Sequence, residues 1–133
     1  MKEKLLEKAF EAMGNAYAPY SNYHVGSAFL LNDGTIVIGA NIENASFGAT
    51  NCAERSAVYA AYSQGYRQND IQAVAIVTDG KILAGPCGIC RQVLSELIPG
   101  DCPIYLSNKK ESKDTTINEL MPFQFGKKDL DEL

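Results

Sequence analysis

The sequence contains no tryptophan, a single histidine, and no apolar stretch close to the ~20 residues that a membrane-spanning helix needs. Its N-terminal segment alternates charged and apolar residues, and it lacks the continuous hydrophobic stretch that marks a secretory signal. These absences exclude a membrane-spanning helix and predict no membrane partner. We therefore expect a cytoplasmic protein.

Basic residues are also scarce, with 12 Lys and Arg against 16 Asp and Glu and a net charge of −4. Affinity for polynucleotides comes largely from Lys and Arg side chains that neutralise phosphates. No basic run with interleaved aromatic residues stands out in the sequence. The composition therefore argues against a nucleic acid partner and favours a small uncharged substrate.

A chain of 133 residues that is 46% hydrophobic has the length of one domain and can bury a core without crosslinks. It nevertheless contains four cysteines. In a cytosolic protein, closely spaced cysteine motifs bind metals or perform chemistry more often than they form disulfides. The cysteines therefore point to a metal or a catalytic site.

Hydrophobic periodicity predicts an amphipathic helix over residues 2–17, and an Asp-Gly turn between two apolar runs predicts a hairpin of strands 25–31 and 35–41. A mostly apolar run predicts a buried strand over 71–78. The remaining patterns predict helices over 52–63, 86–97 and 117–121, strands over 103–107 and 113–116, and an extended tail from residue 122. This order indicates an α/β fold, a three-layer α-β-α sandwich around a mixed sheet of about five strands.

Three cysteines and one glutamate form the most informative pattern in the chain. Cys87 and Cys90 follow Pro86 and are three residues apart, so they share one face of a helical turn. Cys52 also opens a predicted helix, where the partial positive charge of the helix N-terminus favours a thiolate. Three thiolates leave a fourth zinc position for water, and Glu54 would carry the proton. We predict one zinc per chain held by these cysteines, with Glu54 catalytic.

The sequence leaves two alternatives open. Cys102 could supply a fourth thiolate and make the zinc structural, or the cysteines could bind no metal. Glu54 could form a capping box with Asn51. Side chains two residues apart point to nearly opposite sides of a regular helix, so Cys52 and Glu54 meet only if Cys52 lies at the helix start.

Two arginines directly follow members of this pattern. Arg55 follows Glu54, and Arg91 follows Cys90. An arginine that donates to a ligand sulfur would withdraw negative charge from the metal, although both could equally be surface charges. The lone histidine, His24, lies at a predicted strand start and is interpreted as a surface or edge residue.

The segments 52–55 and 86–92, Cys-Ala-Glu-Arg and Pro-Cys-Gly-Ile-Cys-Arg-Gln, resemble the zinc-dependent cytidine deaminases, specifically the small homotetrameric class. The general pattern is His-x-Glu followed by Pro-Cys-x-x-Cys, and the small class has cysteine in place of the histidine. The resemblance continues through 18–21, 25–26, 41–44 and 120–125, nearly the whole chain. It implies a single deaminase domain over 1–133. It also implies hydrolysis of cytidine and deoxycytidine to uridine, deoxyuridine and ammonia in pyrimidine salvage.

The resemblance also implies substrate contacts. Asn41 and Glu43 match the pair that hydrogen-bonds the ribose hydroxyls, and the Ala53 N–H matches the donor to the pyrimidine O2. Phe125 matches a phenylalanine that stacks on the base from a neighbouring subunit of a homotetramer. Tyr23 stands where the family usually has phenylalanine, which keeps a ring for stacking and adds a hydroxyl.

Overall fold

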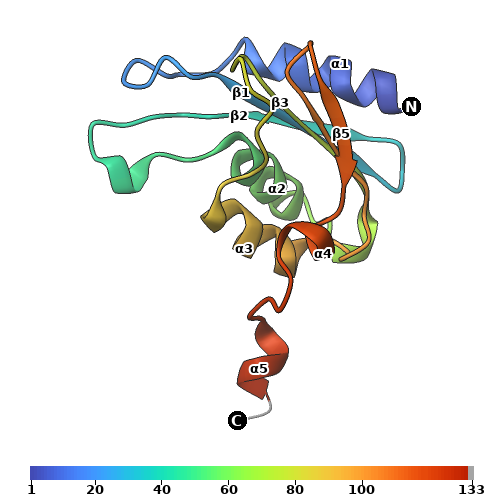
Figure 1. Ribbon diagram of the computed structural model, residues 1–133. Coiled ribbons are helices and arrows are strands. Elements are labelled where there is room, and N and C mark those ends of the chain that lie inside the picture. The colour runs from blue at the N-terminus through green and yellow to red at the C-terminus, as the bar shows by residue number, and fades with distance from the viewer. Residues whose placement is uncertain (132–133) are drawn as a thin grey trace.

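The computed structural model describes residues 1–131 and contains a five-stranded sheet in the order β2-β1-β3-β4-β5 (Figure 1). β3 and β4 run parallel, and every other neighbouring pair is antiparallel. The predicted mixed sheet is therefore confirmed. Its strands are β1 (Val25–Leu31), β2 (Ile36–Ala40), β3 (Ile71–Thr78), β4 (Ile104–Ser107) and β5 (Ser112–Thr115).

Helices cover both faces of the sheet. α1 (Lys2–Met13) lies on one face, and α2 (Ala53–Ser63) and α3 (Gly88–Leu97) lie on the other (Figure 1). Adjacent residues of β1 point to opposite faces, so Ala28 joins the buried cluster under α1 while Phe29 joins the cluster under α2 and α3. The two clusters confirm the three-layer α/β prediction.

Two glycines allow the helices to lie directly on the strands. A Cβ atom at Gly39 in β2 would lie 2.5 Å from the Ala57 nitrogen and 2.6 Å from the Ala53 oxygen of α2. A Cβ atom at Gly26 in β1 would lie 2.0 Å from the Ala9 oxygen of α1. Because these neighbours are backbone atoms, only glycine fits. The position of each helix depends on this close approach.

Two predicted helix boundaries are wrong. α1 ends at Met13 rather than at residue 17, because Tyr17 leaves the helix and donates its N–H to the Asn41 carbonyl at 2.9 Å. α3 begins at Gly88 rather than at Pro86, with Cys87 as its N-cap in an extended conformation. As a result, Tyr17 lies beyond the end of α1 and Cys87 lies just before the start of α3, so neither side chain is part of a regular helix.

The tail also departs from its prediction. The short helix α4 (Ile117–Leu120) is present as expected, but the tail predicted to be extended contains α5 (Lys127–Asp131). The Asp129 carboxylate accepts the Gly126 N–H at 2.8 Å, and Lys127 pairs with Asp131 at 2.9 Å, which stabilises one helical turn. In Figure 1 this tail extends away from the sheet.

Two 3₁₀ turns, η1 (Phe47–Ala49) and η2 (Gln68–Asp70), complete the described elements. Within residues 1–131, none of the helices is both long and apolar enough to cross a bilayer.

Candidate active site

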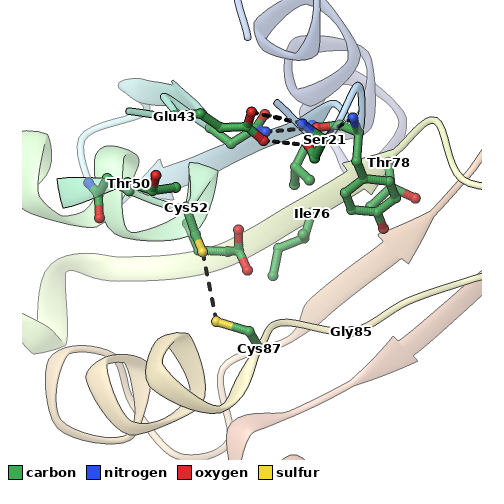
Figure 2. Close-up of a pocket in the computed structure, with 13 residues that line it drawn as sticks. Ser21, Glu43, Thr50, Cys52, Ile76, Thr78, Gly85 and Cys87 are labelled. Carbon is green, nitrogen blue, oxygen red and sulfur yellow. Dashed lines mark hydrogen bonds between the residues drawn. The ribbon is translucent and has the colours of Figure 1, made fainter. Parts of the chain in front are cut away.

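The two predicted cysteine motifs meet at the starts of two helices. Cys52 is the N-cap of α2, Cys87 is the N-cap of α3, and Cys90 lies in the first turn of α3. The three Sγ atoms lie within 4.8 Å of one another, and those of Cys52 and Cys87 are 3.7 Å apart (Figure 2). Tetrahedral zinc with Zn–S bonds of ~2.3 Å separates its sulfurs by ~3.8 Å. The sulfur geometry therefore fits one zinc ion per chain.

Cys102 is not part of this group. It packs in the core beside Ile98 and Ile104, and its burial raises the pKa of its thiol to about 12. In the part of the chain that the structure describes, the sulfur group has no fourth Cys, His, Asp or Glu member. The alternative of a closed four-cysteine site is therefore wrong, and a zinc ion held here keeps a position for water.

Hydrogen bonds among the thiols favour ionisation of Cys52, which cation binding requires. A hydrogen bond from Cys90 is the largest cause that lowers the pKa of Cys52 to about 5, and Arg55 adds to the effect. The same hydrogen bond raises the pKa of Cys90, so the first proton leaves this pair of thiols more readily than the second. Binding of a divalent cation releases the remaining thiol protons.

Glu54 lies beside this group and is only 3% exposed. Burial is the largest cause that raises the pKa of its carboxyl to about 7, and the Cys52 charge acts in the same direction. Cys52 has extended backbone angles (φ −77°, ψ 157°) at the helix start, which meets the condition for both side chains to reach one site. Asn51 donates to Ser56 Oγ at 3.2 Å, and α2 has no side-chain cap, so the capping-box alternative is wrong.

The two arginines have different surroundings. Arg55 Nη2 lies 3.3 Å from Cys52 Sγ, which confirms the predicted hydrogen bond to a ligand sulfur. Arg91 donates instead to two carbonyls, that of Pro86 at 2.8 Å and that of Leu120 at 2.9 Å. The prediction that Arg91 contacts the sulfurs is therefore corrected, because its guanidinium ties the turn before α3 to α4.

A cavity of about 240 Å³ opens beside the sulfur group (Figure 2). Six residues predicted from the sequence line it: Tyr23, Asn41, Glu43, Cys52, Glu54 and Cys87. Sequence reasoning missed the other lining residues, which are Ser21, Val25, Thr50, Asn51, Ile76, Thr78 and Gly85. Ile76 and Thr78 belong to a strand whose apolar pattern indicates burial, so nothing in the sequence distinguishes them from ordinary core residues.

Two isolated β-bridges bring the polar residues of the cavity together. Ile42 pairs with Tyr17 on one side and with Asn51 on the other. These bridges hold Asn41 and Glu43 in the segment next to the start of α2. Hydrophobic periodicity carries no signal for single-residue bridges, so the sequence could not predict this arrangement.

Asn41 is 8% exposed, and its amide joins β2 to the start of β1. Its Nδ2 donates to the Tyr23 carbonyl at 2.8 Å, and its Oδ1 accepts the Val25 N–H at 2.9 Å. The side chain therefore fixes the backbone on both sides of residue 24 and orients the Tyr23 ring at the cavity.

Glu43 accepts the backbone N–H groups of Tyr20 and Ser21 at 2.9 Å and 3.1 Å. The Ser21 hydroxyl donates to its other oxygen. This hydroxyl is the largest cause that holds the pKa of Glu43 below its usual value. A fixed and ionised carboxylate therefore lies at the edge of the cavity, where it can accept hydrogen bonds from hydroxyl groups.

Ala53 is the first residue of α2, a position whose N–H has no acceptor within its own helix. Phe125 lies outside the cavity, on the tail, where its carbonyl accepts Gln92 Nε2 at 3.0 Å and 56% of the residue is exposed. One chain alone therefore does not bring Phe125 to the cavity, and its stacking role stays a prediction about a neighbouring subunit.

A family model described as the cytidine and deoxycytidylate deaminase zinc-binding region matches residues 1–106, which include the three cysteines and Glu54. The chain belongs to this deaminase family. The cytidine deaminase of Halalkalibacterium halodurans is 46% identical over 132 residues, which cover 98% of each chain. The crystal structure of cytidine deaminase from Burkholderia pseudomallei matches with a TM-score of 0.90 and 40% identity, covering 94% of this chain and 99% of that one.

A relative named for a different substrate is the blasticidin-S deaminase of Bacillus cereus, which is 32% identical over 130 residues; the match covers 92% of this chain and 90% of that one. The deaminases of the family are hydrolytic enzymes, and this chain is one of them. Their zinc requirement agrees with the three-sulfur group, so one zinc per chain is the cofactor.

Proposed function

We propose that this deaminase hydrolyses cytidine and deoxycytidine to uridine and deoxyuridine and releases ammonia. The observation that carries the proposal is the Glu54 carboxyl, which is buried beside the sulfur group in a cavity that also contains Asn41 and Glu43. A metal position open to water, a proton carrier and ribose-binding groups are the parts that this reaction needs.

Zinc bound by the three cysteines supplies a Lewis acid that lowers the pKa of water toward neutrality. Glu54 accepts a proton from the water that attacks C4 of the cytosine ring and delivers a proton to N3. It then takes the second proton from the hydroxyl group on C4 and passes it to the amine, so that the C4–N bond breaks, ammonia leaves and the C4 carbonyl of uridine forms. A carboxyl whose pKa is about 7 suits this exchange, because an acid–base catalyst works best near its own pKa. Arg55 withdraws charge from Cys52 and preserves the acidity of the site.

The rest of the cavity would bind the nucleoside. Glu43 accepts hydrogen bonds from the ribose hydroxyls, with Asn41 beside it, and the Ala53 N–H donates to the pyrimidine O2. Tyr23 stacks on the base. Support for these roles comes from the ionised Glu43 carboxylate, the N–H at the start of α2, and an aromatic ring in the cavity wall.

We further propose that the chain, a single domain over residues 1–133, assembles as a homotetramer whose sites are completed by neighbouring chains. Phe125 would stack on the base bound to a neighbour. In support, Phe123 and Phe125 are both exposed on a tail that leaves the body of the chain, and Phe47 is 78% exposed on η1. Large exposed aromatic side chains are typical of interaction surfaces.

The proposed setting is the cytoplasm, and the proposed role is pyrimidine salvage. Reducing conditions keep the three zinc thiols from forming disulfides, which supports a cytoplasmic site of action. Conversion of a free nucleoside needs no phosphate-binding group, in agreement with the acidic net charge of −4.

The deciding experiment follows uridine formation from cytidine and measures zinc per chain in the same sample. Glu54→Ala should retain one zinc per chain and lose turnover by at least the ~10²–10⁴-fold that proton transfer contributes. Glu96→Ala, an exposed glutamate on α3, is the matched control and should retain full activity. Substantial turnover by Glu54→Ala would remove Glu54 from the mechanism.

The relative that deaminates blasticidin S makes a nucleoside antibiotic the second candidate substrate. A panel of cytidine, deoxycytidine, cytosine and blasticidin S separates the two. We expect kcat/KM to be highest for the nucleosides, since Glu43 offers hydrogen-bond acceptors to ribose. Preference for blasticidin S would reverse the assignment.

A further inference from the structure

A pair of side chains outside the catalytic centre joins the first strand to the turn after β3. The His24 N–H donates to Asp79 Oδ1 at 3.0 Å, and His24 Nδ1 lies 2.6 Å from Asp79 Oδ2. In return, the Asp79 N–H donates to the His24 carbonyl at 3.2 Å. We call these three contacts the His24–Asp79 clamp. Neither residue lines the cavity, but Tyr23 and Thr78, which precede them, both do.

Tyr23 depends on contacts of this kind because it lies outside the strand ladder. β1 begins at Val25, and Asn22 has a positive φ of 54°, so residue 23 directly follows a turn. Its N–H donates to Ser21 Oγ at 3.0 Å, and its carbonyl accepts Asn41 Nδ2 at 2.8 Å. Side chains therefore hold the backbone of Tyr23, and no continuous strand pairing does so.

The ring of Tyr23 lies against the same turn that contains Asp79. A Cβ atom at Gly80 would be 3.0 Å from Tyr23 Cε1, so the ring packs closely on the residue after Asp79. The clamp thus acts on the residue after Tyr23, while the turn beyond Asp79 contacts the ring itself. Movement of this turn relative to β1 would move the aromatic wall of the cavity.

The charge of Asp79 strengthens the clamp. Burial opposes ionisation of this carboxyl, yet the backbone N–H and the imidazole of His24 hold its pKa below the usual value. Asp79 is therefore ionised at neutral pH. Hydrogen bonds to an ionised acceptor are stronger than neutral ones.

We propose that Asp79 is a positioning residue that holds the Tyr23 ring in place for stacking on the nucleoside base. This inference depends on the proposed stacking role of Tyr23. Stacking on the base stabilises the bound ground state and the transition state by the same amount, so its loss raises KM and leaves kcat unchanged. A residue in the catalytic machinery would lower kcat instead.

The test is a double-mutant cycle with the zinc-loaded full chain and cytidine. Asp79→Ala should raise KM by about tenfold, the effect of one lost charged hydrogen bond, with kcat within about threefold of wild type. The double variant Tyr23→Ala/Asp79→Ala should have a KM within about twofold of that of Tyr23→Ala alone, because Asp79 acts through Tyr23. His24→Ala keeps the backbone contact to Asp79 and should raise KM by only about threefold.

A ligand-free readout keeps this inference separable from the proposed function. In Asp79→Ala, the amides of residues 23–25 should exchange hydrogen faster than in wild type, with zinc content unchanged. Asp101→Ala, an exposed aspartate in the turn between α3 and β4, should change neither exchange nor KM. If the wild-type enzyme fails to deaminate cytidine, the proposed function is wrong. The hydrogen-exchange measurement would still test whether Asp79 holds residues 23–25 in place. Two results overturn the proposal. One is an unchanged exchange rate in Asp79→Ala, and the other is a tenfold rise in KM when Asp79→Ala is added to Tyr23→Ala.

Discussion

The contact between Gly39 and α2 links packing to zinc binding, and substitution of Gly39 by alanine tests this link. The new Cβ would lie 2.5 Å from the Ala57 nitrogen, about 0.9 Å short of the 3.4 Å at which ordinary van der Waals contact begins. Because the contacted atoms are helix backbone, α2 as a whole must move by most of that distance. Cys52 and Glu54 lie at the start of α2 and must move with it.

This displacement is several times the ~0.2 Å within which metal–ligand distances are held. We expect Gly39→Ala to cost about 2 kcal/mol of stability, as overpacking of a core does, and to lower the melting temperature by about 10 °C. The folded enzyme should also bind zinc at least about tenfold more weakly, since Cys52 no longer meets Cys87 and Cys90.

Gly26→Ala is the matched control. Its Cβ would lie 2.0 Å from the Ala9 oxygen, so it should destabilise the chain at least as much. However, α1 lies on the opposite face of the sheet and carries no zinc ligand. Competition with a chromophoric chelator, run well below both melting temperatures, measures zinc affinity in the two variants. Wild-type zinc affinity in Gly39→Ala, or equal zinc loss in both variants, refutes the reasoning.

Three further predictions concern the thiols and one buried hydroxyl. Chelation of zinc from the native enzyme should make two more cysteines, Cys52 and Cys87, reactive toward a thiol reagent at pH 8, whereas Cys90 and Cys102 should react only after unfolding because both are buried and the pKa of each thiol is raised. The folded pKa of Cys102 exceeds its unfolded value of 9.0, so its contribution to stability is fully present below pH 9.0 and is lost as pH rises toward 12. The difference in free energy of unfolding between wild type and Cys102→Ala, measured in urea, should therefore shrink over that range, and a constant difference contradicts the raised pKa. Thr78 Oγ1 is buried without a hydrogen-bond partner in the described chain, so Thr78→Val should raise stability by about 1 kcal/mol; a lower melting temperature would contradict this.

Most of the architecture could be predicted from the sequence. The apolar run of β3 indicated a strand buried on both faces, and the Asp-Gly turn indicated the β1–β2 hairpin, because these patterns depend on near neighbours in the chain. Element ends were less predictable. Tyr17 leaves α1 to pair with residue 42, and α5 forms where Asp129 and Lys127 stabilise a turn at the tail. Such contacts compete with local propensity and leave no periodic signal.

The sequence alone was enough to predict the three cysteines as a zinc group and to propose Glu54 as the proton carrier, because cysteine spacing, helix starts and a nearby carboxyl are local features with strong chemical meaning. It could not separate the roles of the two arginines, and it left the role of Cys102 open. Only the tertiary structure decided that Arg55 contacts a ligand sulfur, that Arg91 holds a turn, and that Cys102 lies in the core. It likewise brought Thr78 and Tyr23 to one cavity and Asp79 beside them. The physical reason is that these contacts join residues far apart in the chain, and packing alone sets their distances.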